Sequence, residues 1–125
     1  MTQKLAILLW AAAPDRPELV AAPFVYAAAA GALDAEVEMH FGGKCVRLLV
    51  VGEAAKIRSA EWSDETVLTL MQQAAANGAR FFACSTAARA YVQPNETFIA
   101  EHSGSVGAAT FAQRALDPEW RTLVF

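Results

Sequence analysis

Cys84 is the residue best placed for nucleophilic chemistry, and it is one of two cysteines among 125 residues. It ends the apolar run "RFFAC" and directly precedes "STAARAY", a short stretch of helical pattern. We therefore expect Cys84 at the junction of a strand and a helix, with Ser85 as the N-cap. Peptide N–H groups and the helix dipole favour an anion there, and such settings lower a cysteine's pKa from about 8.5 to roughly 3.5–7.5. Two interpretations remain open: a reactive thiolate or a small core residue.

Further candidates lie in loops after expected strands, because such loops meet at the carboxyl edge of a parallel sheet and form its ligand site. Arg89 could bring positive charge to Cys84. His102, beside the glycine turn "HSGSVG", could be a base or hydrogen-bond partner of the cysteine, or a plain surface histidine. The backbone amides that could hold a small anion belong to Gly42, Gly43, Lys44 and Gly104.

Three other residues each have two possible roles. Cys45 could be a resolving thiol for Cys84, or it could occupy a buried helix position. Trp10 and Tyr91 could wall a pocket, or they could be ordinary core aromatics at the ends of elements.

The stretch "AEVEMHF" (35–41) has the pattern of a half-buried strand rather than of a metal site. Its apolar residues alternate with Glu36, Glu38 and His40, which we expect to face solvent at or near a sheet edge. No second cluster of ligands accompanies them, so we predict no metal site and no cofactor. The sequence also has no C-x-x-C dithiol, and the spacing of Cys84 and Arg89 is one residue too short for a cysteine phosphatase loop.

The elements that must position these residues alternate between strands and helices along one expected domain, 1–125. We expect strands at 4–10, 35–41, 79–84, 96–100 and 121–125, and helices at 18–33, 65–78, 85–91 and 108–116. Residues 42–52 fit either a buried strand or a short helix, and Asp64 is the expected N-cap of the helix that follows it. The alternation predicts an α/β fold, a three-layer α/β/α sandwich with a mostly parallel sheet of about five strands and flavodoxin-like layering.

The apolar composition of the chain indicates that another subunit covers part of its surface. Hydrophobic residues make up 55% of the chain and charged residues 18%, and the mean hydropathy is +0.27. The expected helix at 18–33 is apolar nearly all the way round, although Pro23 should kink it or mark its start, so we expect the sheet on one side and a neighbouring subunit on the other.

Charge and run length exclude other partners. The formal charge is −3, and the absence of a Lys/Arg cluster argues against nucleic acid and anionic membrane. The apolar runs are too short to span a bilayer, so we expect a cytoplasmic protein whose cysteines are thiols.

The order of these parts resembles the DsrE family, small α/β proteins of sulfur-transfer systems and their uncharacterised relatives. The resemblance is carried by "KLAILLW", the Ala-rich first helix and "VEMHF" followed by glycine. It continues through "LMQQAAANGARFFACSTAA" to the terminal "FAQRALDPEWRTLVF". It implies a DsrEFH-like fold, assembly as a homotrimer or homohexamer, and a short helix at 44–51.

The resemblance also implies a function for Cys84. In relay members of the family the cysteine at this place accepts a sulfane sulfur as a persulfide and hands it on, so a sulfur donor and an acceptor protein are the implied partners. This chain departs from those members after the cysteine, where "ARAYVQPNE" replaces an "RRG"-like segment. The alternative function is a non-catalytic oligomeric module that binds a small ligand or a protein, with backbone amides around Gly42–Lys44 and Gly104–Gly107 as its site.

Overall fold

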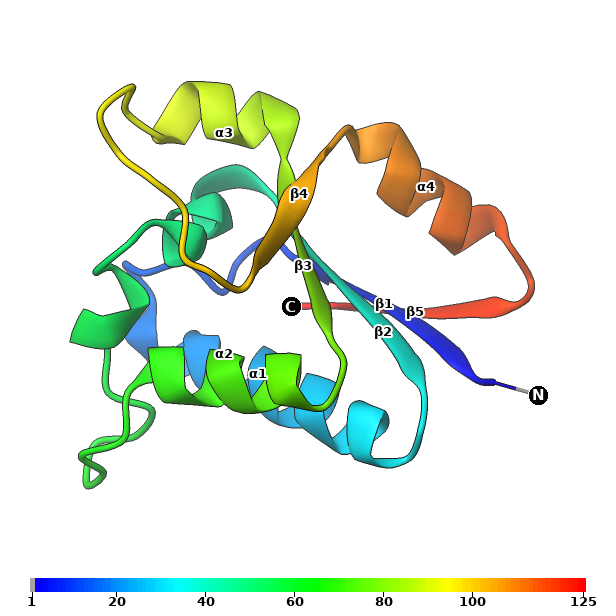
Figure 1. Cartoon of the computed structure of the whole chain (residues 1–125), viewed down its shortest axis with the longest axis horizontal. Helices are drawn as coiled ribbons and strands as arrows, with labels where there is room; N and C mark the ends of the chain where they lie inside the picture. The colour runs from blue at the N-terminus through cyan, green and yellow to red at the C-terminus, as the bar shows by residue number, and fades with distance from the viewer. Residues whose placement is uncertain (1) are drawn as a thin grey trace.

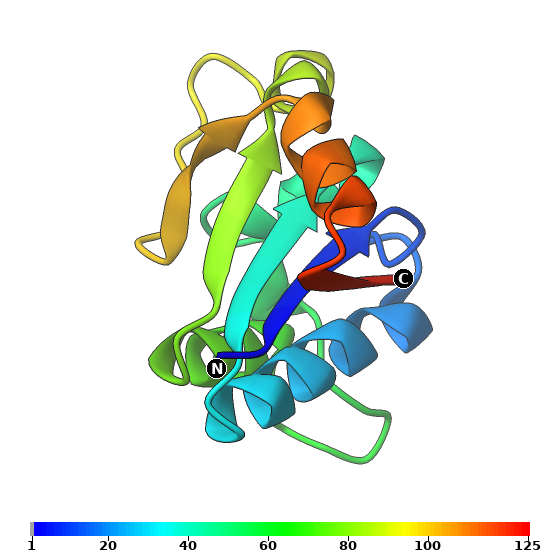
Figure 2. The same cartoon turned by 90° about the vertical axis from the view of Figure 1, so that its right-hand side faces the viewer.

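A five-stranded, wholly parallel sheet organises the chain in the computed structural model, which describes residues 2–125. Its spatial order is β4-β3-β2-β1-β5 (Figures 1 and 2). The strands are β1 (Lys4–Leu9), β2 (Glu36–Phe41), β3 (Arg80–Cys84), β4 (His102–Val106) and β5 (Trp120–Val124). The chain steps outward from β1 to β4 and then returns to pair β5 with β1. Because parallel crossovers are right-handed, this reversal places the last helix on the opposite face from the first two.

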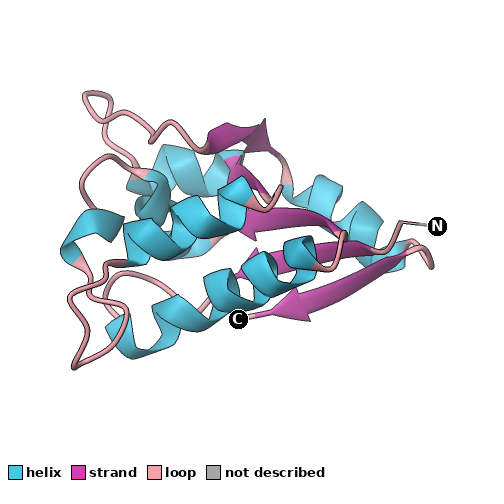
Figure 3. Cartoon of the chain, turned by 60° about the horizontal axis from the view of Figure 1, so that its bottom comes forward, coloured by secondary structure: helices cyan, strands magenta, loops and turns pink. Residues whose placement is uncertain are grey.

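The helices confirm the three-layer α/β/α prediction. They are α1 (Pro17–Ala32), α2 (Val67–Ala76), α3 (Ser85–Tyr91) and α4 (Ala108–Leu116), with the 3₁₀ helices η1 (Gly43–Leu49) and η2 (Ala54–Lys56). α1 and α2 pack side by side over one face, and α4 lies over the other (Figures 1 and 3). The short-helix alternative for residues 42–52 is therefore the right one. No helix within residues 2–125 is long and apolar enough to cross a membrane.

The face under α1 and α2 holds an apolar core. Alternate residues of β1, β2 and β3 point into it, and Phe24 of α1 contacts Phe41 and Phe81 with ring centroids 6.0 Å apart in both pairs. α2 buries the side that its sequence predicts: Val67, Leu70, Met71 and Ala74. In the single chain the opposite side of α1 exposes Val25 and Tyr26, so its burial by a neighbouring subunit stays a prediction.

The expectation that β2 lies at or near a sheet edge is wrong. β2 is the central strand, paired with β1 on one side and β3 on the other. Glu38 and His40 are only 1% and 4% exposed, although their alternation with apolar residues predicts a solvated face. The physical reason is that α4 covers this face and supplies an arginine, Arg114, that binds the Glu38 carboxylate.

The strand expected at 96–100 is also misplaced. β4 is His102–Val106, within the segment predicted to be a glycine turn, whereas Phe98 forms only an isolated bridge with Val50. A register shift opposite Phe81 and Phe82 bulges β4, and the Ser103 hydroxyl accepts the Phe81 N–H at 3.0 Å. A small polar run on an edge strand carries no apolar alternation, which is why its sequence indicates a turn.

Two predicted helix caps shift by one or two residues. Thr66, not Asp64, caps α2, and its Oγ1 accepts the Thr69 N–H at 3.3 Å. Cys84 itself, rather than Ser85, is the N-cap residue of α3. α1 begins with Pro17 in its first turn and continues through Pro23. Cys84 thus stands directly at the boundary between strand and helix.

Candidate functional site

Cys84 is a half-buried thiol at the carboxyl end of β3. Its backbone is extended, with φ −68° and ψ 121°, and α3 begins at the next residue. No hydrogen bond joins its side chain to the first amides of α3. The thiol therefore has the strand-to-helix position that the sequence predicts. Its sulfur does not accept a hydrogen bond from the backbone of α3, as the side chain of a capping residue would.

A cavity of about 130 Å³ lies beside Cys84, between the sheet and the start of α4. Leu8, Trp10 and Phe111 form much of its apolar wall. The ionisable side chains in its lining are Cys84 and His40. The cavity therefore brings a thiol and an imidazole to one small, mostly apolar space.

A second, more open hollow of about 420 Å³ reaches Cys84 from the side of α3. Trp10 and Cys84 line both spaces, and Tyr91 lines only the outer one. The pocket interpretation of Trp10 and Tyr91 is therefore confirmed. The sulfur atom stands between an inner cavity and an approach from the surface.

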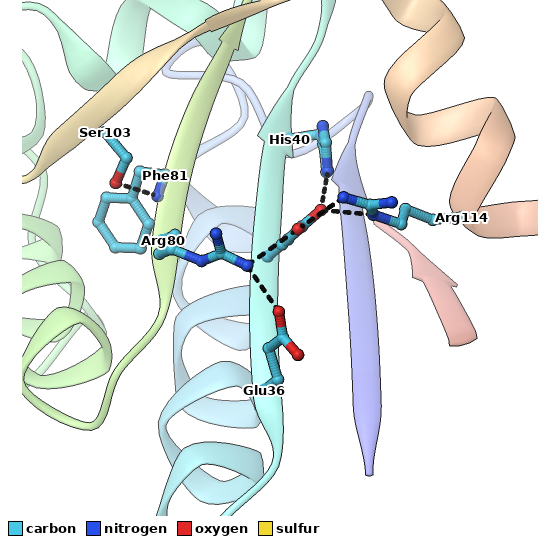
Figure 4. A network of polar contacts seen from close by, with 7 residues as sticks. Glu36, His40, Arg80, Phe81, Ser103 and Arg114 are labelled. Carbon is cyan, nitrogen blue, oxygen red and sulfur yellow. Dashed lines mark hydrogen bonds and ion pairs between the residues drawn. The ribbon is translucent and has the colours of Figure 1, made fainter. Parts of the chain in front are cut away.

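A polar network holds His40 from below (Figure 4). The His40 Nε2 and Glu38 Oε1 atoms lie 3.1 Å apart. Arg114 donates to both carboxylate oxygens of Glu38 at 3.1 Å, and Arg80 donates to Oε2 at 3.0 Å. Arg80 also reaches Glu36 at 2.8 Å. Three different elements, β2, β3 and α4, thus converge on one buried carboxylate.

These contacts set the charges of the network. Burial pushes the pKa of Glu38 upward, but the hydrogen bonds from Arg114 and His40 outweigh it and leave that pKa below its ordinary value. Burial lowers the pKa of His40, and the hydrogen bond with Glu38 opposes this only in part. Near neutral pH, Glu38 is therefore ionised and His40 is neutral.

The glycine loop after β2 lies at the same edge of the sheet. Gly42 lines the inner cavity and Gly43 the outer hollow. A Cβ on Gly42 would stand 3.3 Å from the Trp10 ring, and Gly43 has φ +51°, which disfavours other residues. The Lys44 ammonium lies 3.7 Å from the Asp15 carboxylate, and Lys44 lines neither space beside Cys84.

Two residues of α3 that were predicted to assist the cysteine do not line the spaces beside its thiol. Ser85 is half-buried as the first residue of α3, and Arg89 is exposed. Neither lines the inner cavity or the outer hollow. The added positive charge expected from Arg89 is therefore not placed at the thiol.

His102 and Gly104 line neither the inner cavity nor the outer hollow beside Cys84. Because β4 starts at His102, the ladder pairs this histidine with Phe81, whereas Cys84 pairs with Val106. His102 stacks on Phe98 with centroids 4.2 Å apart, and Gly104 lies within β4 rather than in a turn. The structure therefore does not bring His102 into the cavity beside Cys84.

The sequence interpretation missed His40. The signal was present as a carboxylate and a histidine in a strand with two arginines elsewhere in the chain, Arg80 and Arg114, that could neutralise a buried charge. Within residues 2–125, no group of three or more His, Cys, Asp and Glu side chains is arranged to hold a metal ion.

Cys45 occupies the buried helix position, not that of a resolving thiol. It is fully buried in η1, and burial together with the charge of Asp15 raises its pKa to about 11. At that value almost none of it is thiolate near neutral pH.

Together, the parallel sheet and the cysteine at its carboxyl edge define a small α/β protein with a strand-end thiol site. Comparison with protein families matches the DsrE/DsrF-like family over residues 4–125, and the chain belongs to that family. Its fold is similar to the crystal structure of the ychN protein from E. coli, with a TM-score of 0.75 and 13% identity over 100% of both chains. A comparison with curated proteins gives no match.

Proposed function

We propose that the protein is a sulfur carrier of the DsrE type, in which Cys84 holds a sulfane sulfur as a persulfide. Membership of the DsrE/DsrF-like family supports this class of function. The observation that carries the proposal is the position of Cys84, which lines both the inner cavity and the surface hollow at the carboxyl edge of the sheet. A carrier needs both: an approach for the donor and a sheltered space for the added sulfur.

The transfer needs no oxidant or reductant. The Cys84 thiolate attacks the outer sulfur of a donor persulfide, and a new S–S bond forms on Cys84. The S–S bond of the donor breaks, and its electron pair leaves with the donor as a thiolate. The same exchange with an acceptor thiolate returns Cys84 to its starting state. Carriage therefore consists of two exchange steps at one atom.

Sulfur loading from a defined donor tests this function. The protein is incubated with glutathione persulfide, freed of the donor and examined by intact mass spectrometry without a reductant. We expect a mass gain of one sulfur atom in the wild type and in the Cys45→Ser control, and none in Cys84→Ser. Equal loading of Cys84→Ser would exclude Cys84 as the carrier.

Self-association belongs to the same proposal. The exposed apolar side of α1, with Val25 and Tyr26, would be covered in a homotrimer or homohexamer. Donor and acceptor proteins would then meet the open hollow over α3, where Trp10 is 65% exposed.

A further inference from the structure

We propose that His40, oriented by Glu38, is the acid–base partner of Cys84. On loading, the S–H proton of Cys84 passes to His40 Nδ1, the thiolate attacks the donor persulfide, and the donor's leaving thiolate takes the proton from His40. The net change is one sulfane sulfur moved and no proton gained or lost. This inference rests on the proposed carrier function and adds a second chemical residue to its site.

The sheet register brings the two side chains to one space. His40 is paired with Phe82 on β3, and Cys84 lies two residues further along that strand on the same face. Their Cα atoms are thus on the order of 8 Å apart, from the spacing of neighbouring strands and the rise per residue. Both side chains line the cavity of about 130 Å³, which has room for a water molecule or for the outer sulfur of a persulfide. The proton can pass directly or through one water.

Glu38 fixes which nitrogen of His40 carries the proton. The carboxylate is held by Arg80 and Arg114, so it accepts the Nε2–H of the ring. Nδ1 is then left with a free lone pair. Figure 4 shows the other nitrogen of His40 at the end of the side chain away from the dashed contact. Within residues 2–125, His40 has no other protein hydrogen-bond partner, although its side chain is only 4% exposed.

The charges around the ring suit a base. The groups that face His40 are Glu38 on its own strand, Arg80 and Cys84 on β3, and Arg114 on α4. Burial and the two arginines lower the pKa of His40, while Glu38 opposes them, so the ring is unprotonated at neutral pH. A neutral imidazole can accept the thiol proton, and Glu38 then stabilises the imidazolium that forms.

The variant His40→Gln tests the role of the imidazole as a base while it keeps the hydrogen bond to Glu38. Glutamine retains an amide N–H for Glu38 and removes the imidazole base, and His102→Gln is the matched control. We measure the rate of Cys84 alkylation by iodoacetamide from about pH 5.5 to 9. At pH 7 we expect His40→Gln to react at least about tenfold more slowly than the wild type. The difference should be smaller at the alkaline end of this range than at pH 7.

The outcomes distinguish this inference from the proposed function. A wild type that is not loaded by glutathione persulfide contradicts the carrier function, while the alkylation profile still tests His40. A His40→Gln protein that loads and alkylates as fast as wild type at pH 7 overturns the role of His40 and leaves the carrier function standing.

A second measurement covers the case in which His40→Gln does not fold. ¹⁵N NMR of the wild-type histidines should show His40 as the neutral Nε2–H tautomer, with ring signals that move when Cys84 is alkylated. An Nδ1–H tautomer, or ring signals unchanged by alkylation, would overturn the inference.

Discussion

The two faces of the sheet are built on opposite principles. Under α1 and α2 the buried side chains are apolar, and three phenylalanine rings, Phe24, Phe41 and Phe81, contact one another. Under α4 the sheet buries Glu38 and His40, encloses a cavity and meets a helix in which no residue is fully buried. The face under α1 and α2 therefore stabilises the fold by close packing. The face under α4 is less closely packed and contains a sheltered polar site.

This contrast shows what a buried polar group implies. A carboxylate removed from water costs free energy unless charged donors satisfy it. Glu38 is satisfied by Arg80 and Arg114, so the hydrogen bond to His40 is not needed to neutralise it. The network that orients the imidazole therefore holds one hydrogen bond more than the neutralisation of Glu38 requires.

The largest expected difference between the faces comes from neighbouring phenylalanines on β3. Phe81 is fully buried on the apolar face, whereas Phe82 is half-buried and its ring centroid lies 5.5 Å from that of His40. We expect Phe81→Ala to lower the free energy of unfolding by roughly 3–5 kcal/mol, because the emptied site cannot collapse. Phe82→Ala should cost roughly 1–2 kcal/mol, since solvent already reaches that ring. Urea unfolding followed by circular dichroism measures both; equal losses would show that the faces pack alike.

The next contrast is between the two cysteines. At neutral pH we expect iodoacetamide to modify Cys84 at least about a hundredfold faster than Cys45, whose pKa of about 11 and full burial leave almost no accessible thiolate. Peptide mapping by mass spectrometry after timed quenching gives both rates. In urea both cysteines should react at similar rates, which is the control for their intrinsic reactivity. A native Cys45 that reacts as fast as Cys84 would reopen the resolving-thiol role.

Elements with strong periodicity could be predicted from the sequence, and so could the place of the thiol. The continuous apolar run of β1, the amphipathic α2 and the strand-cysteine-helix order at Cys84 each identify one element locally. The sequence does not state which strand is central or what covers its second face. Those facts depend on the return of the chain to β5 and on the docking of α4, which are long-range contacts.

The same long-range contacts explain the error about the histidines. His102 lies near a glycine turn in the sequence, but β4 begins with it, so it is at the far end of the strand from Cys84. The alternation of β2 by itself predicts that His40 faces solvent. The residue that completes its network is Arg114 on α4, which lies 74 positions further along the chain (114 − 40). The local pattern therefore pointed to a histidine that does not line the cavity, and it missed the one that does.

The smallest contrast lies within β2, between Glu38 and Glu36. Glu38→Gln should lower the free energy of unfolding at neutral pH by about 1–3 kcal/mol, because charge-assisted hydrogen bonds in a buried site become neutral ones. Glu36→Gln removes one exposed contact with Arg80 and should cost less than about 1 kcal/mol. Thermal unfolding of both variants and the wild type over a range of pH measures these values.

The pH dependence of that loss gives the sharper result. The folded-state pKa of Glu38 lies below the ordinary value of 4.5, so its stabilising contribution is complete above that pH and is lost as the pH falls through the folded value. Glu38→Gln should therefore lose stability at neutral pH and approach the wild type in acid, whereas Glu36→Gln should stay close to the wild type throughout. A Glu38→Gln curve parallel to the wild type across this range would mean that the buried carboxylate is not ionised. Glu38 could then no longer fix the tautomer of His40, and the chemical interpretation of the α4 face would fail with it.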